Sequence, residues 1–194
     1  AWRWTSFGSF TPEDIDGQLC THIVYAFATL DAETFPLNID DSVDVYKSFL
    51  NKATEVRKRN GFKVYFGLGG WNDSKDDKYS RLASSSRSNR RNFVGYIIRI
   101  IEQNGFDGLD LDWEFPVCWQ GDCSRSLQQD SENFIGLLED LSEAFTSQVL
   151  LLSIAVSASK IVVNRGYTRI SLLVRHVDWI AVSYDMYYIF MTFR

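Results

Sequence analysis

The chain has 194 residues, the size of one ordinary domain, and 45% of them are hydrophobic, so a single buried core can form. Its net charge is −5 and its Lys and Arg residues are scattered, which leaves no basic stripe for a phosphate backbone, so we expect no nucleic-acid partner. No apolar run approaches the roughly 18 residues of a membrane-spanning helix, and we expect no membrane partner.

Apolar, β-branched runs alternate along the chain with amphipathic stretches. Strands are predicted at residues 21–30, 62–68, 106–114, 150–156 and 179–184. Helices are predicted at residues 43–60, 90–104, 131–147 and 170–175. This alternation is typical of α/β proteins with a parallel sheet, either doubly wound or closed into a barrel. A barrel of eight units needs about 250 residues, so this chain is too short to close one alone.

Two of the predicted helices carry one apolar stripe each at helical spacing. The first stripe consists of Phe93, Tyr96, Ile97, Ile100 and Ile101. The second consists of Phe134, Leu137, Leu138, Leu141 and Phe145. We interpret both stripes as surfaces that face the core, and not as cofactor-binding segments. No glycine-rich phosphate loop follows the first predicted strand, which weakens the dinucleotide-binding version of the fold.

The segment FDGLDLDWE carries three carboxylates at a strict spacing of two, namely Asp110, Asp112 and Glu114. Side chains alternate between the faces of a strand, so the three acids are expected on one face. Carboxylates stacked in a buried site cannot all ionise cheaply, so we expect raised pKa values and shared protons. An acidic strand end or a metal-ligand edge is the alternative. The following Phe115-Pro116 stops the strand and puts Glu114 at its carboxyl end, where α/β active sites are built.

The three cysteines leave one unpaired whichever two of them pair. Cys118 and Cys123 bracket the short loop CWQGDC and are close enough to form a disulfide in an oxidising compartment, which leaves Cys20 without a partner. Three reduced, buried thiols are the alternative. The two histidines, His22 and His176, are far apart in sequence, so a zinc site or a Ser-His-Asp triad is poorly supplied, and we expect no metal.

FDGLDLDWE matches at every position the signature of glycoside hydrolase family 18, the chitinases and chitinase-like lectins. HIVYAFATL at residues 22–30 resembles the family's second barrel strand, FGLGGW at 66–71 its third, and YDMY at 184–187 its sixth. CTHIVYAF and the CWQ loop are most similar to multidomain arthropod chitinases. The resemblance implies an incomplete (β/α)8 TIM-type barrel with about five βα units of eight, in which residues 1–194 form a partial catalytic domain containing strands two to six.

The resemblance also implies a chemistry, the hydrolysis of β-1,4-linked N-acetylglucosamine in chitin or chitooligosaccharides with retention and without a cofactor. The nucleophile is then the N-acetyl oxygen of the substrate itself. By matched position Glu114 protonates the glycosidic oxygen and later activates water. Asp112 stabilises the oxazolinium ion, and Asp110 shares a proton with it. Tyr184 orients the acetamido carbonyl.

Five further residues match substrate-binding positions of the family. Phe27 and Trp71 are expected to stack on sugar faces, with ordinary barrel packing as the alternative. Asp185 is expected to help hold the sugar. Gly69 and Gly70 are expected to keep the end of the third strand small, so that the sugar and the acidic strand can approach closely.

The chain departs from the family pattern at several positions. Gly67 stands where Ser is usual, Val182-Ser183 precede Tyr184 where Met is common, and the segment after Asp185 does not continue the pattern. A catalytically silent chitin-binding lectin, or a fragment without independent activity, is therefore an alternative to the enzyme.

The ends of the chain and its one glycosylation sequon bear on where the protein works. Residue 1 is Ala and no signal-peptide pattern follows, so we expect any secretion signal to have been removed or not included. The resemblance implies a secreted, extracellular protein. The sequon Asn72-Asp73-Ser74 is expected to be unused, because a glycan there would crowd the presumed cleft.

Overall fold

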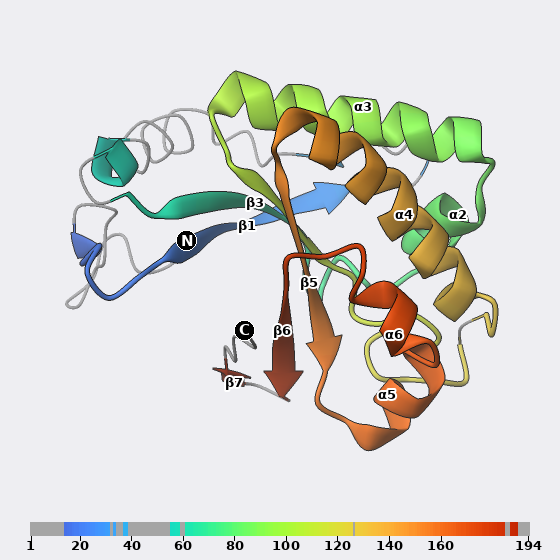
Figure 1. The fold of residues 1–194 in the computed structure, drawn as a ribbon. Coiled ribbons are helices and arrows are strands. Elements are labelled where there is room, and N and C mark those ends of the chain that lie inside the picture. The colour runs from blue at the N-terminus through green and yellow to red at the C-terminus, as the bar shows by residue number, and fades with distance from the viewer. Residues whose placement is uncertain are drawn as a thin grey trace.

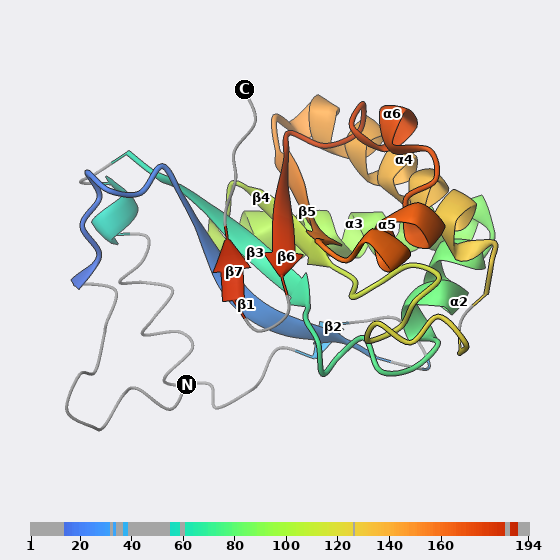
Figure 2. The same cartoon turned by 90° about the horizontal axis from the view of Figure 1, so that it is seen from below.

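The structure of the chain is a computed structural model that describes residues 14–31, 33, 37–38, 55–58, 61–125, 127–184 and 187–189. Its centre is a seven-stranded sheet with the strand order β2-β1-β3-β4-β5-β6-β7 (Figure 1). Five of these strands run parallel: β1 (His22–Leu30), β3 (Lys63–Gly69), β4 (Gly108–Asp112), β5 (Leu151–Ser157) and β6 (Trp179–Tyr184). The two edge strands, β2 (Leu37–Asn38) and β7 (Tyr187–Ile189), pair antiparallel with their neighbours (Figure 2).

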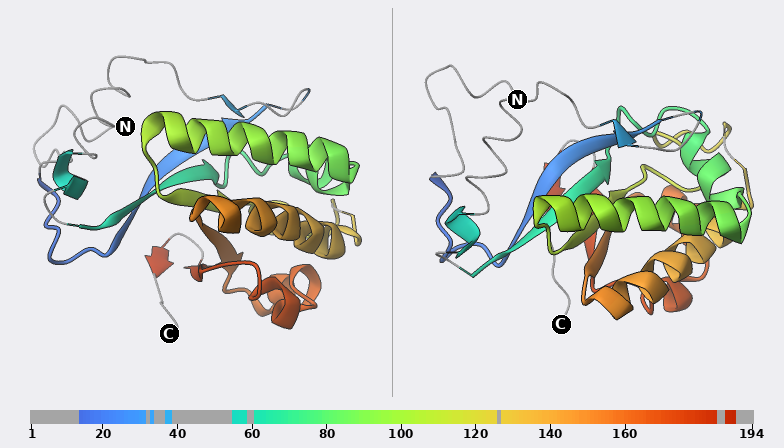
Figure 3. Two further views of the ribbon diagram at one scale, coloured as in Figure 1. Left: turned by 45° about the horizontal axis from the view of Figure 1, so that its top comes forward. Right: turned by 90° about the horizontal axis from the view of Figure 1, so that it is seen from above.

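The helices follow the strands as expected for βα units. They are α2 (Lys78–Ser84), α3 (Arg87–Asn104), α4 (Asp130–Gln148), α5 (Lys160–Gly166) and α6 (Ile170–Leu173), and residues 55–58 form a further helical turn. The two long helices, α3 and α4, lie side by side on one face of the sheet (Figure 3). The chain is therefore built in layers: α3 and α4 cover one face of the sheet, and the opposite face is not covered by these two helices.

The predicted elements agree with the structure in type and differ at their ends. The strand predicted at residues 179–184 is β6, and the helix predicted at 131–147 is α4 extended by one residue at each end. The strand predicted at 106–114 is too long, because β4 covers only Gly108–Asp112. Of the helix predicted at 43–60, only residues 55–58 lie within the described part of the chain. The sequence analysis missed α2, α5 and both edge strands.

The boundaries of α3 follow from its sequence. It begins after Ser86, whose hydroxyl accepts a hydrogen bond from the Asn89 N–H. It ends at Gly105, which has a φ of 69° and donates its N–H to the last turn of the helix. A residue without a Cβ is suited to this left-handed conformation, and the chain then enters β4.

Both predicted apolar stripes lie in the core. In the α4 stripe all five side chains are buried, and in the α3 stripe four are buried while Tyr96 is half-buried. They pack against one face of β4, where Leu109 and Leu111 have no exposed surface. Trp113 continues this face, 5.6 Å edge-on from the ring of Phe134 on α4. Because side chains alternate along a strand, the acids of the same segment lie on the opposite face.

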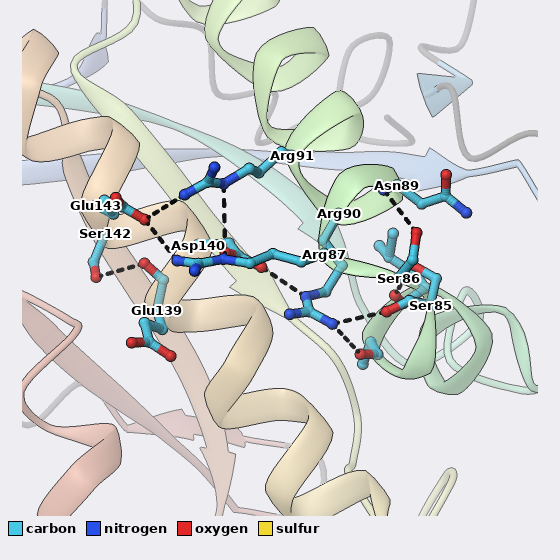
Figure 4. Close-up of polar contacts among 12 residues, drawn as sticks. Ser85, Ser86, Arg87, Asn89, Arg90, Arg91, Glu139, Asp140, Ser142 and Glu143 are labelled. Carbon is cyan, nitrogen blue, oxygen red and sulfur yellow. Dashed lines mark hydrogen bonds and ion pairs between the residues drawn. The ribbon is translucent and has the colours of Figure 1, made fainter.

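Ion pairs connect the exposed sides of the two long helices (Figure 4). Asp140 on α4 accepts hydrogen bonds from Arg87 at 2.8 Å and from Arg90 at 2.7 Å. Glu143, one turn further along α4, accepts from Arg87 and from Arg91. These contacts fix α3 against α4, and with them one layer of the fold.

Candidate active site

The three acids of FDGLDLDWE are brought together as the two-residue spacing predicts. Asp110 and Asp112 belong to β4, and Glu114 follows two residues after the strand ends. All three are buried, with exposed fractions of 6%, 2% and 3%. In the parallel ladder Asp110 stands opposite Gly67 of β3 and Ser153 of β5. The prediction of a carboxylate row on one buried face is confirmed.

Burial raises the pKa of each of these carboxyl groups. It raises the pKa of Asp110 to about 6, although a hydrogen bond from the Ser153 hydroxyl, 2.6 Å from Asp110 Oδ1, acts in the opposite direction. Burial and the neighbouring charges of Glu114 and Asp110 raise the pKa of Asp112 to about 8. Burial raises the pKa of Glu114 to about 7. The site therefore stores protons near neutral pH, as a general acid requires.

Two carboxylate oxygens of the row have no hydrogen-bond partner within the described residues. They are Oδ1 of Asp112 and Oε1 of Glu114, and both are buried. A buried polar atom without a partner costs free energy, and such atoms in a native protein call for an explanation. Asp110, by contrast, is held by Ser153. The row thus has one fixed member and two members free to bind a proton or a ligand.

The loop between β3 and α2 fixes the backbone of the acidic segment. The Glu114 N–H donates to the hydroxyl of Ser74 at 2.8 Å, and the Gly70 N–H donates to the carbonyl of Asp112 at 2.9 Å. Ser74 has no exposed surface. Its hydroxyl accepts the hydrogen bond of the Glu114 N–H at a point where β4 has ended and no neighbouring strand that the structure describes supplies an acceptor. Sequence analysis considered Ser74 only as part of a sequon.

Asp73 holds this loop in place through three contacts. Its carboxylate accepts from the Leu30 N–H at 3.0 Å and from the Tyr79 hydroxyl at 2.6 Å, and it forms an ion pair with Lys78. Both Asp73 and Lys78 are buried. The end of β1, the loop and the start of α2 are thereby joined. Sequence analysis missed this role and considered Asp73 only as the middle residue of a sequon.

Gly69 and Gly70 permit close approaches at the end of β3. Gly69 has a φ of 118°, and a Cβ built on it would lie 2.3 Å from the Asp112 carbonyl oxygen. Gly70 has a φ of 86°, and its Cβ would lie 3.0 Å from the ring of Phe27. A side chain at position 69 would push β3 away from the acidic strand, and one at position 70 would press on the ring of Phe27. The expected close approach of a sugar to the acidic strand stays a prediction.

Gly67, where the family pattern has Ser, is explained by the packing of β1. A Cβ on Gly67 would lie 3.0 Å from both the carbonyl oxygen of Tyr25 and a methyl group of Val24. The hydroxyl that reaches Asp110 comes from the other neighbouring strand, at Ser153. The departure at Gly67 therefore leaves Asp110 with a hydroxyl partner.

Phe27 and Trp71 are largely exposed, at 41% and 45%. Phe27 lies on β1 where the pairing register with β3 shifts between Tyr25 and Ala28. Trp71 follows Gly70 at the end of β3. The peptide bonds Ala26–Phe27 and Glu114–Phe115 are both cis. Within this chain both rings are therefore accessible.

Tyr184 is the last residue of β6, so its backbone lies at the carboxyl end of the parallel sheet, as does the end of β4. Its side chain lies outside the described part of the chain, and so does Asp185. Their predicted roles therefore stay predictions.

Tyr167, between α5 and α6, is a buried residue that sequence analysis did not single out. It is 4% exposed. Burial raises its pKa well above the usual value, and the charges of Asp112 and Glu114 add to that effect. Tyr167 therefore lies within electrostatic range of the acid row. A single tyrosine in a connecting segment carries no periodic signal, so the sequence could not have indicated it.

The Cys118–Cys123 disulfide is present as predicted, and Cys20 is free and half-buried. Among the described residues no group of three His, Cys, Asp or Glu side chains is arranged to hold a metal ion. The helices within the described ranges are all too short or too polar to cross a membrane.

The model of the family described as glycosyl hydrolases family 18 matches residues 2–189. The chain belongs to this family. A relative in Drosophila melanogaster, "Probable chitinase 10", is 46% identical over 189 residues, which cover 96% of this chain and 8% of that protein. The second catalytic domain of an Ostrinia furnacalis Group II chitinase has a similar structure, with a TM-score of 0.86, 46% identity, and coverage of 93% of this chain and 47% of that one.

The same Ostrinia domain has been solved as a mutant in complex with penta-N-acetylchitooctaose. Human YKL-39, described as a pseudo-chitinase with retained chitooligosaccharide binding properties, is also similar, with a TM-score of 0.74, 27% identity, and coverage of 92% of this chain and 47% of that one. The chain thus spans about half the length of the solved domains it matches. The predicted fold class, an incomplete α/β barrel of the TIM type, is confirmed.

Proposed function

We propose that the chain is the acid-bearing part of a chitinase-type glycoside hydrolase, which cleaves β-1,4 N-acetylglucosamine linkages with retention. The observation that carries the proposal is the row of three buried carboxyls with raised pKa values, two of which keep an unpartnered oxygen. Such a row is costly for stability and gives a site that can donate and shift protons near neutral pH.

Glu114 acts as the general acid. With a pKa raised by burial to about 7, it holds a proton in a large fraction of molecules at neutral pH and can donate it to the glycosidic oxygen. The Ser74 hydroxyl and the segment after β3 keep its backbone fixed. The resulting carboxylate then activates water for the second step. The attacking nucleophile of the first step is the N-acetyl oxygen of the substrate, so no second catalytic carboxylate is needed for attack.

Asp112 and Asp110 act as a pair that shares one proton. Because the pKa of Asp112, about 8, lies above that of Asp110, about 6, the shared proton resides on Asp112 at neutral pH. When Asp112 turns to the acetamido N–H, this proton passes toward Asp110, and the Asp112 carboxylate stabilises the oxazolinium ion. Ser153 keeps Asp110 in place during that exchange.

The remaining predicted residues bind the sugar. The exposed rings of Phe27 and Trp71 offer faces on which sugar rings stack. Tyr184, at the carboxyl end of β6, orients the acetamido carbonyl, and Asp185 helps to hold the sugar. In this proposal residues 1–194 are part of a catalytic domain that contains the family's strands two to six.

The protein is proposed to be secreted and to meet chitin outside the cell. The Cys118–Cys123 disulfide supports an oxidising compartment, where such bonds persist.

The test uses the 194-residue chain with chitopentaose, the pentamer of N-acetylglucosamine. Binding is measured by calorimetry and cleavage by mass spectrometry of the products. Glu114→Gln is expected to slow cleavage by about 10²- to 10⁴-fold, because it removes the proton donor while preserving size. Glu102→Gln, an exposed glutamate on α3, is the matched control and is expected to change nothing. Measurable and equal cleavage rates for wild type and Glu114→Gln would reject Glu114 as the acid, and binding without cleavage by the wild type would favour the silent lectin or a fragment without independent activity.

A further inference from the structure

The loop closed by the Cys118–Cys123 disulfide contacts both Glu114 and Trp71. Gln120, in the middle of the loop, makes both contacts. Its backbone N–H donates to the Glu114 carbonyl at 2.7 Å, and its side-chain Nε2 donates to the Trp71 carbonyl at 2.8 Å. One residue therefore connects the end of the acidic segment to the backbone of Trp71, just after β3.

Internal contacts make the loop a firm support. Gln120 and Gly121 both have positive φ, 49° and 78°, so the chain turns tightly at the tip. The Gly121 N–H donates to the Cys118 carbonyl at 2.8 Å, and Trp119 pairs with Asp122 in an isolated antiparallel bridge. The disulfide, the turn and the bridge all restrict the loop from within.

The loop is also anchored to the helical layer. The Trp119 indole N–H donates to Asp130 Oδ2 at 3.2 Å, and the Ser80 hydroxyl of α2 donates to the other oxygen of that carboxylate. Trp119 and Asp130 are both buried. The position of Gln120 is thus set by the core.

The indole of Trp71 lies over the tip of this loop. A Cβ built on Gly121 would stand 4.0 Å from Cη2 of the ring. The other donor to the Trp71 carbonyl, the N–H of Ser74, is longer at 3.3 Å. The Gln120 amide is therefore the shorter of the two tethers that hold the Trp71 backbone.

We propose that Gln120 is a positioning residue that holds Trp71 at a fixed place relative to Glu114, so that a sugar stacked on the indole presents its glycosidic bond to the acid. The inference rests on the proposed function, since it concerns the same site. It assigns the disulfide-closed loop to substrate alignment, with Gln120 as the residue through which the loop acts on the aromatic platform.

The decisive variant is Gln120→Glu, which keeps the size of the side chain and replaces the Nε2 donor with an oxygen. The backbone N–H to the Glu114 carbonyl is untouched. Loss of one partly exposed hydrogen bond is expected to raise the Kd and KM for chitopentaose about two- to fivefold, with kcat unchanged. A merely loosened loop would instead lower kcat, because Gln120 also holds the Glu114 carbonyl.

The matched control is Arg125→Ala. Arg125 donates to the Lys75 carbonyl at 3.1 Å, so this variant removes a side-chain contact between the segment just after the disulfide-closed loop and the loop after β3, without touching Trp71. Its Kd for chitopentaose is expected to equal that of the wild type. Equal affinities of wild type and Gln120→Glu, or equal losses in Gln120→Glu and Arg125→Ala, would overturn the proposal.

A ligand-free measurement separates this inference from the proposed function. The indole N–H signal of Trp71 in an NMR spectrum is identified by its loss in Trp71→Phe. It is expected to shift in Gln120→Glu and to stay in place in Arg125→Ala. Failure of the wild type to bind chitopentaose would reject the proposed function. The indole signal would then test by itself whether Gln120 positions Trp71. A signal that does not move in Gln120→Glu would overturn the positioning role.

Discussion

Two carboxylate clusters lie on opposite sides of the sheet, and their pKa values are shifted in opposite directions. Asp140 on α4 is met by the guanidinium groups of Arg87 and Arg90 (Figure 4). Its partial burial alone would raise its pKa, but the hydrogen bonds from these arginines lower it below the usual value. Asp112 and Glu114 are also buried, form no ion pair with any residue that the structure describes, and have raised pKa values.

The difference separates a structural acid from a reactive one. Where an acid fixes helix against helix, the fold surrounds it with donors, and the charged form is the stable form. Where an acid must gain and lose a proton, the fold withholds donors and keeps the neutral form accessible. The sequence contains the same residue type in both places, so the environment alone decides the role.

Removal of the structural acid is expected to have the largest effect on stability. Asp140→Ala leaves Arg87 and Arg90 without their shared carboxylate and should lower the free energy of unfolding by about 2 kcal/mol. The loss stays below that of a fully buried pair because Arg87 is 54% exposed and keeps part of its hydration. Urea unfolding measures it, with Glu139→Ala, an exposed neighbour on α4, as the control. Equal stability of the two variants would contradict the role given to Asp140.

The two clusters should also respond to pH with opposite signs. For Asp112 the folded pKa, about 8, lies above the ordinary value of 3.8, so the folded state holds a proton that the unfolded state releases. Stability therefore falls as pH rises from about 4 to 8. For Asp140 the folded pKa is lowered, so its contribution is present above the ordinary value and is lost as pH falls below it.

Asp112→Asn should accordingly be more stable than the wild type at pH 8 and equal to it near pH 4. Asp140→Asn should be less stable than the wild type at pH 8 and approach it as the solution is acidified. Urea unfolding at the two pH values checks both. Parallel pH dependences of the two variants would show that the clusters do not differ as described.

The smallest effect is expected at the contact between Ser153 and Asp110. Ser153→Ala removes the hydroxyl 2.6 Å from Asp110 Oδ1 and should cost at most about 1 kcal/mol of stability. Because that hydrogen bond lowers the pKa of Asp110, its removal should raise the pKa further, as followed by carbon NMR of the carboxyl group. The control is Ser142→Ala on α4, which removes a hydroxyl that contacts the ring of His176. An unchanged titration of Asp110 would mean that burial alone sets its pKa.

Local periodicity allowed the central features to be predicted. The two-residue spacing of Asp110, Asp112 and Glu114 predicted one buried face, and the helical spacing of the two apolar stripes predicted the α3 and α4 layer. The predicted strand ran two residues past Asp112. Its partner strand β3 ends at Gly69, where a φ of 118° turns the chain away. The length of β3 cannot be predicted from the acidic segment itself.

The residues that support the site could not be predicted, because they act across long separations. Ser74 is 40 residues from Glu114, and Gln120 is 49 residues from Trp71. Nothing in their local sequence distinguishes them from ordinary loop residues. The short helix α2 was missed for a related reason: the polar residues before it are typical of a loop, and its core-facing side is apparent only from the buried contacts of Tyr79 and Leu82.

The buried hydroxyl of Ser74 has a practical consequence for anyone who maps sugars on this protein. The usual way to abolish an Asn-x-Ser acceptor is to change either its first or its third residue. Here a change of the third residue would also take away the acceptor of the Glu114 amide, and a loss of activity would be mistaken for the effect of a missing glycan. Asn72, which is exposed, is the position to alter.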